Sequence, residues 1–292
     1  MGAAACLLSA LAWAVAVTWF RGPIAEHGSL AVNLGKCWIA TILLGLTAWW
    51  IGDLSAITTA SATAVGMVAI SGIAGLTLGD TALFAAVHRL GAHRALLFQT
   101  LGPVFAALLA FAFLAEQPTV TQLLGTLAVL AGVALALDPG ESEPGAKRSM
   151  SVAGIAFAVL AAFGQGAGVV LAKGGMEDVP VIGASFVRLG TAAVGLLVTL
   201  AIAGQLGRAA RGLARPAAMR GLAGPTLLGT FVGFLLMMLG IARAPASVAA
   251  VLLSTAPIFS LFVDRIAVGT RITPRGALGT LIAVAGVAGL VL

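Results

Sequence analysis

The sequence predicts an all-α, polytopic membrane protein of ten transmembrane helices, arranged as two five-helix inverted repeats. The first observation is composition: 60% of the residues are hydrophobic, 9% are charged and the mean hydropathy is +1.11, whereas about 25% of residues are charged in a soluble domain. The second is a series of long apolar spans, and the third is an internal duplication. Helices are expected because isolated strands leave backbone groups unsatisfied in hydrocarbon.

The first half of the chain contains five apolar spans, each close to the length of about 20 residues that crosses a bilayer as a helix. No positively charged stretch precedes the first span, so we expect a retained helix rather than a cleaved signal peptide. None of the runs alternates as a barrel strand would. The spans are Gly2–Phe20, Leu30–Ile51, Ala62–Val87, Ala95–Ala115 and Val120–Leu137.

The second half follows the polar linker Asp138–Ser151 (DPGESEPGAKRSMS) and again contains five spans. We therefore divide the chain into a first repeat (1–137), a linker (138–151) and a second repeat (152–292). A further polar stretch, Gly204–Arg220, carries four arginines between two of the spans. The spans are Val152–Leu171, Val181–Ala203, Leu222–Ala242, Ser247–Val268 and Gly276–Leu292.

The duplication is visible when the sequence is shifted by 154 residues. Pro103 then meets Pro257, and Leu124–Leu127 (LGTL) meets Leu278–Leu281 (LGTL). Because each half has an odd number of spans, the second half enters the membrane from the opposite side. Inverted repeats are typical of alternating-access transporters, whose substrate site lies near the midplane between the repeats.

Orientation follows from the basic residues outside the spans. Twelve lysines and arginines fall in loops on one side and two on the other. The positive-inside rule places the richer side in the cytoplasm and both termini outside. The basic residues sit mostly at span ends, so the net charge of +6 does not indicate a nucleic-acid partner.

Three charged residues, Lys36, Asp80 and Arg188, lie well within apolar spans. A charge at the centre of a membrane helix costs about 2.5–3.5 kcal/mol, so it normally faces a cavity or a partner. Lys36 and Arg188 are repeat equivalents at an offset of 152, and together they could hold the carboxylate of a substrate. The alternative is that each is internally paired or extends to the interface. Asp80 could bind a substrate ammonium, relay a proton, or neutralise Lys36 or Arg188.

Two prolines and three polar or aromatic residues complete the candidate site. Pro103 and Pro257 each remove a backbone donor, and Pro103 frees the carbonyl of Gln99. A kink there suits a hinge or binding site, and equally a helix that bends only to pack. Trp13 and Gln165 align at an offset of 152 and are candidates for a polar and aromatic cavity lining.

Signatures of other functions are absent from the sequence. It contains no metalloprotease, nucleophile-elbow or nucleotide-binding motif. The three histidines lack a spacing that suggests a metal site, and nothing indicates ATP coupling. We therefore expect neither an enzyme nor a cofactor or metal.

The ten spans in two halves resemble the EamA branch of the drug/metabolite transporter superfamily. The residues that carry the resemblance are Gln99–Phe105 (QTLGPVF) with Glu116 and Gln122–Val133 in the first half, and Pro257–Phe259 (PIF) with Gly279–Val287 in the second. Thr270 stands where the second half would have its glutamate. Lys36 and Arg188 fall where this family often has a basic residue.

The resemblance implies a multi-pass inner-membrane carrier with a central substrate cavity, and YddG-type amino-acid exporters are the nearest group. We therefore expect a secondary transporter that exports amino acids or related small metabolites by alternating access. Lys36 or Arg188 would hold the carboxylate, and Asp80 or a polar amide the ammonium. The alternatives are a multidrug exporter, a sugar-phosphate or nucleotide-sugar carrier, and a non-transporting scaffold or receptor. Proton coupling and the choice between monomer and homodimer stay open.

Overall fold

The computed structural model describes residues 2–114, 119–136, 151–176, 178–243 and 252–291, and within these it contains helices and no strand. Helices overlap every expected apolar span. Glu116, linker residues 138–150 and residues 247–251 of the ninth span lie outside the described residues.

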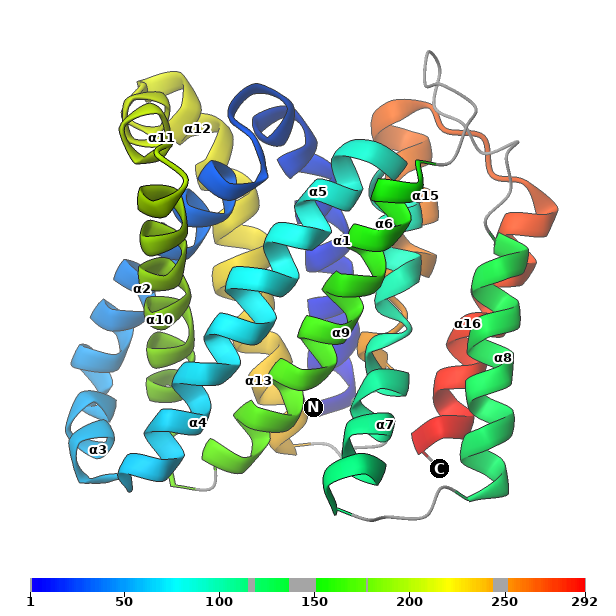
Figure 1. The fold of residues 1–292 in the computed structure, drawn as a ribbon, viewed down its shortest axis with the longest axis horizontal. Helices are drawn as coiled ribbons and strands as arrows, with labels where there is room; N and C mark the ends of the chain where they lie inside the picture. The colour runs from blue at the N-terminus through cyan, green and yellow to red at the C-terminus, as the bar shows by residue number, and fades with distance from the viewer. Residues whose placement is uncertain (1, 115–118, 137–150, 177, 244–251, 292) are drawn as a thin grey trace.

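The first half begins with two long helices, α1 and α2, and continues through a third stretch made of three segments (Figure 1). α1 extends past the expected end at Phe20 and includes Pro23. The elements are α1 (Gly2–His27), α2 (Ser29–Ile51), α3 (Asp53–Thr59), α4 (Ala62–Gly72), the π-helix η1 (Ile73–Asp80), α5 (Thr81–Leu90), α6 (Ala92–Gln99), α7 (Gly102–Leu114) and α8 (Val120–Ala136).

The second half follows the same order, and its short helix α11, within the arginine-rich stretch, takes the place of α3 in the first half. Its third stretch is again three segments with a π-helix in the middle. The elements are α9 (Val152–Gly175), α10 (Val181–Ile202), α11 (Leu206–Leu213), α12 (Pro216–Pro225), the π-helix η2 (Thr226–Val232), α13 (Gly233–Arg243), α15 (Ala256–Val268) and α16 (Pro274–Val291).

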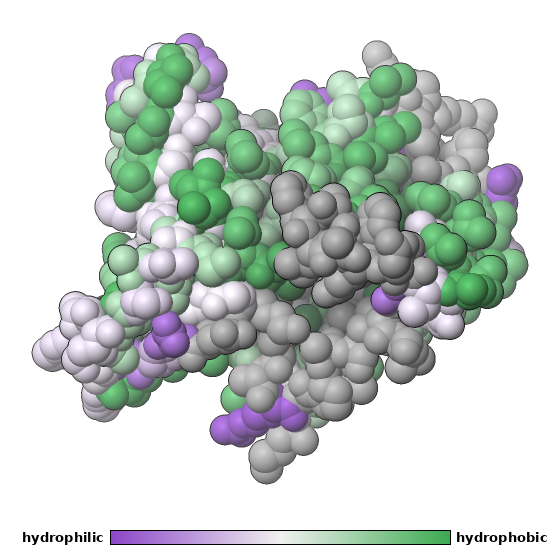
Figure 2. Space-filling model, turned by 60° about the horizontal axis from the view of Figure 1, so that its bottom comes forward, coloured by the Kyte–Doolittle hydropathy of each residue, from purple (hydrophilic) through white to green (hydrophobic). Residues whose placement is uncertain are grey.

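The surface is that of a membrane protein. Six helical stretches among the described residues are long and apolar enough to cross a bilayer, and α8 and α16 are shorter apolar helices. Large apolar side chains are exposed, including Trp50 at 88% and Ile202 at 83%. Figure 2 shows a face on which hydrophobic residues predominate and hydrophilic residues form small separate groups. Because such a surface is unfavourable in water, the chain is a polytopic membrane protein.

The two π-helices occupy matching positions in the two halves. Shifting η1 by 154 residues places it over Leu227–Phe234, which overlaps η2 and the start of α13. π-helical turns are rare and frequently mark functional sites. Nothing in the apolar pattern of the sequence had indicated them.

Elements of the two halves pack directly against one another. α9 packs along η1, α4 and α5, α2 packs along α10, and α1 packs along α13 and α15. α8 and α16 pair with each other at one end of the bundle (Figure 1). The start of α1 and the end of α16 lie on one side of the molecule, and α11 and α12 lie on the opposite side (Figure 1).

Candidate substrate-binding site

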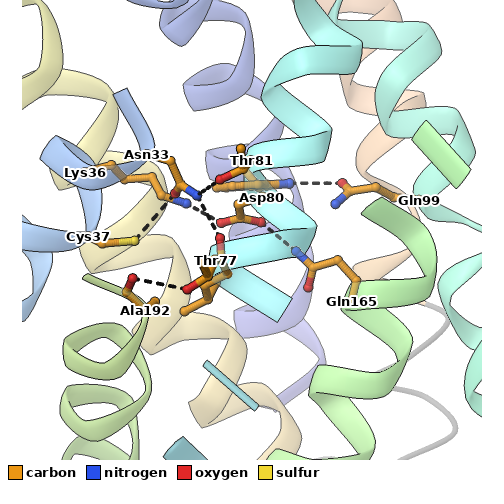
Figure 3. Close-up of polar contacts among 11 residues, drawn as sticks. Asn33, Lys36, Cys37, Thr77, Asp80, Thr81, Gln99, Gln165 and Ala192 are labelled. Atoms are coloured by element: carbon orange, nitrogen blue, oxygen red, sulfur yellow. Dashed lines mark hydrogen bonds and ion pairs between the residues drawn. The ribbon is translucent and has the colours of Figure 1, made fainter. Parts of the chain in front are cut away.

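A buried ion pair lies between α2 and the end of η1. The Lys36 ammonium donates to Oδ2 of Asp80, and both side chains are 1% exposed (Figure 3). The ammonium also lies 5.1 Å from the ring centroid of Phe84 and 5.5 Å from that of Trp13. These aromatic faces provide further stabilisation for a desolvated cation. Lys36 is therefore neutralised within the protein.

The second oxygen of Asp80 is held from the other half of the chain. Nε2 of Gln165, on α9, donates to Oδ1 of Asp80 at 2.7 Å (Figure 3). Nearby, Nε1 of Trp13 on α1 donates to Oε1 of Gln99 on α6 at 3.2 Å. The carboxylate thus accepts one hydrogen bond from each half. Such partners are needed because a buried charge without hydrogen bonds is strongly unfavourable.

Asn33 links α2 to the backbone of the π-helix beside the ion pair. It precedes Lys36 by about one turn of α2, and its Nδ2 donates to the Leu76 carbonyl at 2.7 Å and to Oγ1 of Thr81 at 2.8 Å. Thr77, also on η1, donates to the Ala192 carbonyl of α10 at 3.1 Å. Side chains and backbone from both halves therefore hold η1 in place.

Arg188 lies on α10, where it packs against η1 and α9, and it is 3% exposed. Its Nη2 is close to the backbone of η1 and of α9, since an added Cβ would lie 2.8 Å from it at Gly75 and 3.2 Å at Gly168. The guanidinium carbon lies 5.5 Å from the ring centroid of Phe234. Within the described residues, Nε has no hydrogen-bond partner and no carboxylate pairs with the guanidinium. A buried cation without a counterion is unfavourable unless a ligand completes it.

The equivalent cations of the two halves face different kinds of residue. Arg188 corresponds to Lys36 at an offset of 152, and Phe234 corresponds to Asp80 at an offset of 154. Each cation on the second long helix of its half therefore faces a residue at, or within two residues after, the end of the π-helix of that half. In the first half that residue is a carboxylate, and in the second it is an aromatic ring.

A cavity of about 660 Å³ opens beside this network, on the side of α11. We call it the basic cavity because its lining includes four arginines and one acid. Its lining also includes Thr81, the residue after Asp80, whereas Lys36, Asp80 and Arg188 do not line it. The Asn33–Thr81 hydrogen bond therefore lies between the cavity and the ion pair. The charged lining residues are Glu26, Arg89, Arg208, Arg211 and Arg215.

The structure brings most of the sequence-predicted residues together. Trp13, Lys36, Asp80, Gln99 and Gln165 form hydrogen bonds or ring contacts in one cluster, with Arg188 packed against its η1 and α9 walls. Of the roles considered for Asp80, the geometry has it neutralising Lys36. That these six residues bind a substrate remains a prediction.

The two prolines mark helix breaks rather than the kinks expected within continuous helices. Pro103 lies in the first turn of α7, after a turn at Thr100 and Leu101, and Pro257 lies in the first turn of α15. Proline is favoured there because first-turn amides need no helical acceptor. Motion at these breaks remains a prediction.

Sequence reasoning missed Asn33, Thr81, Phe84 and Phe234. Thr81 and Phe84 are common residue types in an apolar span and carry no signal of their own. Asn33 could have been found, because it is the only asparagine in the sequence and lies within an apolar span. Phe234 could have been found, because the repeat offset that pairs Pro103 with Pro257 also places it opposite Asp80. Among the described residues, no group of three potential ligands could hold a metal ion.

A buried polar cluster inside an apolar helical bundle defines a polytopic membrane protein with an intramembrane polar site. The family model of EamA-like transporters matches residues 1–137 and 152–292, so the chain belongs to the EamA-like transporter family. Members of this family are transporters, and the chain is accordingly a membrane transporter.

Two further comparisons are consistent with this assignment. The chain is 26% identical over 202 residues to "Protein LicB" of Haemophilus influenzae, and the match covers 67% of this chain and 66% of that protein. A solved structure described as "Crystal structure of protein" is similar with a TM-score of 0.64 and 17% identity, and the match covers 99% of this chain and 95% of that one. The second likeness concerns the fold alone.

Proposed function

We propose that the chain is a secondary carrier that exports amino acids or related small metabolites by alternating access, with Arg188 holding the substrate carboxylate. The observation that carries the proposal is the difference between the two buried cations. Lys36 is neutralised by Asp80, whereas Arg188 forms no ion pair among the described residues and lies beside the Phe234 ring and the backbone of two glycines. A planar guanidinium is suited to bind a carboxylate through two parallel hydrogen bonds.

The proposal includes ten membrane crossings in two inverted repeats within the inner membrane. Its support is the family match in each half and the position of the start of α1 and the end of α16 on one side of the molecule (Figure 1). The arginine-bearing α11 lies on the other side, which the positive-inside rule assigns to the cytoplasm. The basic cavity then faces the cytoplasm, the side from which an exporter takes its substrate.

Alternating access requires the two halves to move relative to each other around the site. Gln165 from the second half holds Asp80 of the first, and Arg188 packs against η1. A substrate bound to Arg188 would therefore contact both halves at once. The helix breaks before Pro103 and Pro257 are the positions at which we place the hinges.

Flux from proteoliposomes tests this function directly. The experiment measures export of a panel of radiolabelled amino acids and organic acids, with and without a pH gradient, by the wild type, by Arg188→Gln and by the surface control Arg243→Gln. We expect saturable flux in the wild type and in the control, and loss of flux in Arg188→Gln. Absence of flux for every compound would indicate a scaffold or receptor and contradict the proposal. Equal flux in Arg188→Gln would remove the assigned role of Arg188.

A sugar-phosphate carrier is the second candidate, and the basic cavity favours it. Four arginines and one glutamate line that cavity, a balance that attracts a more highly charged anion. Adding a sugar phosphate to the same panel compares the two candidates, because only this second function predicts that it competes with the carboxylates.

A further inference from the structure

We infer that the substrate carries a net negative charge and is an organic acid whose carboxylate has no compensating ammonium. This inference deepens the proposed function and rests on it for the location of the site. It follows from three features of the described residues: the charge of the central cluster, the occupation of Asp80 and the lining of the basic cavity.

The central cluster holds one net positive charge. Lys36 and Asp80 cancel, and Arg188 adds a cation that forms no ion pair among the described residues. The other buried Asp and Arg side chains among the described residues, Asp264 and Arg94, lie outside this cluster and contribute one charge of each sign. Because an uncompensated charge in a desolvated interior is costly, a bound anion of charge −1 would leave the interior neutral.

A substrate ammonium would have to share Asp80 with Lys36 and Gln165. Both oxygens of Asp80 are already used, one by Lys36 and the other by Gln165. An ammonium that displaced Lys36 would leave a second buried cation without its counterion. Beside Arg188, the surroundings are instead the Phe234 ring and the backbone of Gly75 and Gly168. These groups suit an apolar substrate body attached to a carboxylate.

The basic cavity selects the same sign of charge before the substrate reaches the cluster. The Arg89 side chain is held by two contacts. Its Nη1 donates to the Ala85 carbonyl at 2.9 Å, and its guanidinium carbon lies 4.8 Å from the ring centroid of Phe157. Arg208, Arg211 and Arg215 are exposed along the α11 side of the cavity. A cleft lined by charges of one sign concentrates ligands of the opposite sign.

Ligand binding to the purified protein in detergent tests the charge requirement. The ligands form two matched series, each with one side chain and three charge states: hydrocinnamate, phenylalanine and phenethylamine, then isocaproate, leucine and isoamylamine. The readout is the rise in unfolding temperature with ligand concentration, which gives the affinity. We expect the carboxylates to bind at least about tenfold more tightly than the matching amino acids, a difference of about 1.4 kcal/mol, and the amines not to bind.

Arg188→Gln should remove carboxylate binding, whereas Arg243→Gln, an exposed arginine outside the cluster, should keep it. Should Arg188→Gln fail to fold, the affinity order of the wild type alone decides. A zwitterion that binds as tightly as its matching carboxylate, or a wild type that binds neither carboxylate, would overturn the inference.

Flux measurements distinguish failure of this inference from failure of the carrier function. Movement of a carboxylate that no coupled proton balances is electrogenic, so an imposed membrane potential should then change the carboxylate flux. Zwitterion flux that is insensitive to the potential would overturn the charge inference and leave the carrier intact. The expected binding order without any flux would contradict the carrier and support the charge requirement.

Discussion

The Arg188 guanidinium lies over the ring of Phe234, with the guanidinium carbon 5.5 Å from the ring centroid, at positions that correspond to the Lys36–Asp80 ion pair of the first half. Both halves of the duplicated chain thus bury a cation at the equivalent position, and only Lys36 of the first half is paired with a carboxylate. The unmatched guanidinium is the feature from which the transport proposal and the expected substrate charge both follow.

Supplying the missing counterion should block the site. In Phe234→Asp the new carboxylate occupies the position equivalent to Asp80, so it would pair with Arg188 and exclude a substrate anion. We expect at least about a tenfold loss of isocaproate affinity, measured by the thermal shift in detergent. Phe234→Asn is the matched control, since it has nearly the same shape without the charge, and it should bind more tightly than Phe234→Asp. Equal affinity in the two variants would contradict the pairing.

Breaking the Lys36–Asp80 pair should destabilise the fold. Asp80→Asn leaves the Lys36 ammonium buried without its counterion, and such losses cost about 3–5 kcal/mol. Replacing both partners, as in Lys36→Met with Asp80→Leu, removes the charges together and should recover much of that stability. Unfolding in detergent measures the difference. A double variant no more stable than Asp80→Asn would show that the ion pair is not the source of the effect.

Close packing of α8 on α16 predicts a difference between two glycines. A Cβ at Gly132 would overlap the backbone of Ala283, whereas a Cβ at Gly66 on α4 meets nothing within 4 Å. Gly132→Ala should therefore destabilise the protein by about 1–3 kcal/mol through overpacking. Gly66→Ala should be neutral or stabilising by up to about 1 kcal/mol, because alanine favours a helix. Equal unfolding temperatures for the two variants would contradict the observed contact.

Neutralising the basic cavity should slow the capture of anions from the cytoplasmic side. We expect about a tenfold fall in initial flux at low substrate concentration and low ionic strength, and a smaller fall at high salt, where the field is screened. A control with as many arginines replaced on the same side, but outside the cavity lining, should show little change. Equal losses in the two variants would attribute the effect to overall charge. The cavity variant is Arg208→Gln, Arg211→Gln and Arg215→Gln, and the control is Arg220→Gln, Arg271→Gln and Arg275→Gln.

Most of the helical architecture could be predicted from the sequence, because apolar spans are set by the thickness of the bilayer. Ala62–Val87 was expected as one span, and α4, η1 and α5 together cover it. The π-helix within it could not be predicted. Its hydrogen-bond register depends on the packing of η1 against α9 and on Asn33, which come from distant parts of the chain.

The residues of the site could be predicted from the sequence, but which of them pair with one another could not. A charged residue in an apolar span is informative on its own, so Lys36, Asp80 and Arg188 could be selected from the sequence. The choice of Lys36 as the partner of Asp80 depends on how α2 and α10 lie around η1. Spacing along the chain carries no information about that choice.

The matched π-helices also have a consequence for how this chain arose. A π-helical turn accommodates an extra residue relative to an α-helix, and both halves carry one at nearly the same place. The simplest history is that the ancestral single unit already had the insertion before its gene was copied and fused. On this history the difference between Asp80 and Phe234 arose after the duplication. Under the proposed function, the first copy neutralises its cation with its own carboxylate and the second relies on the transported anion.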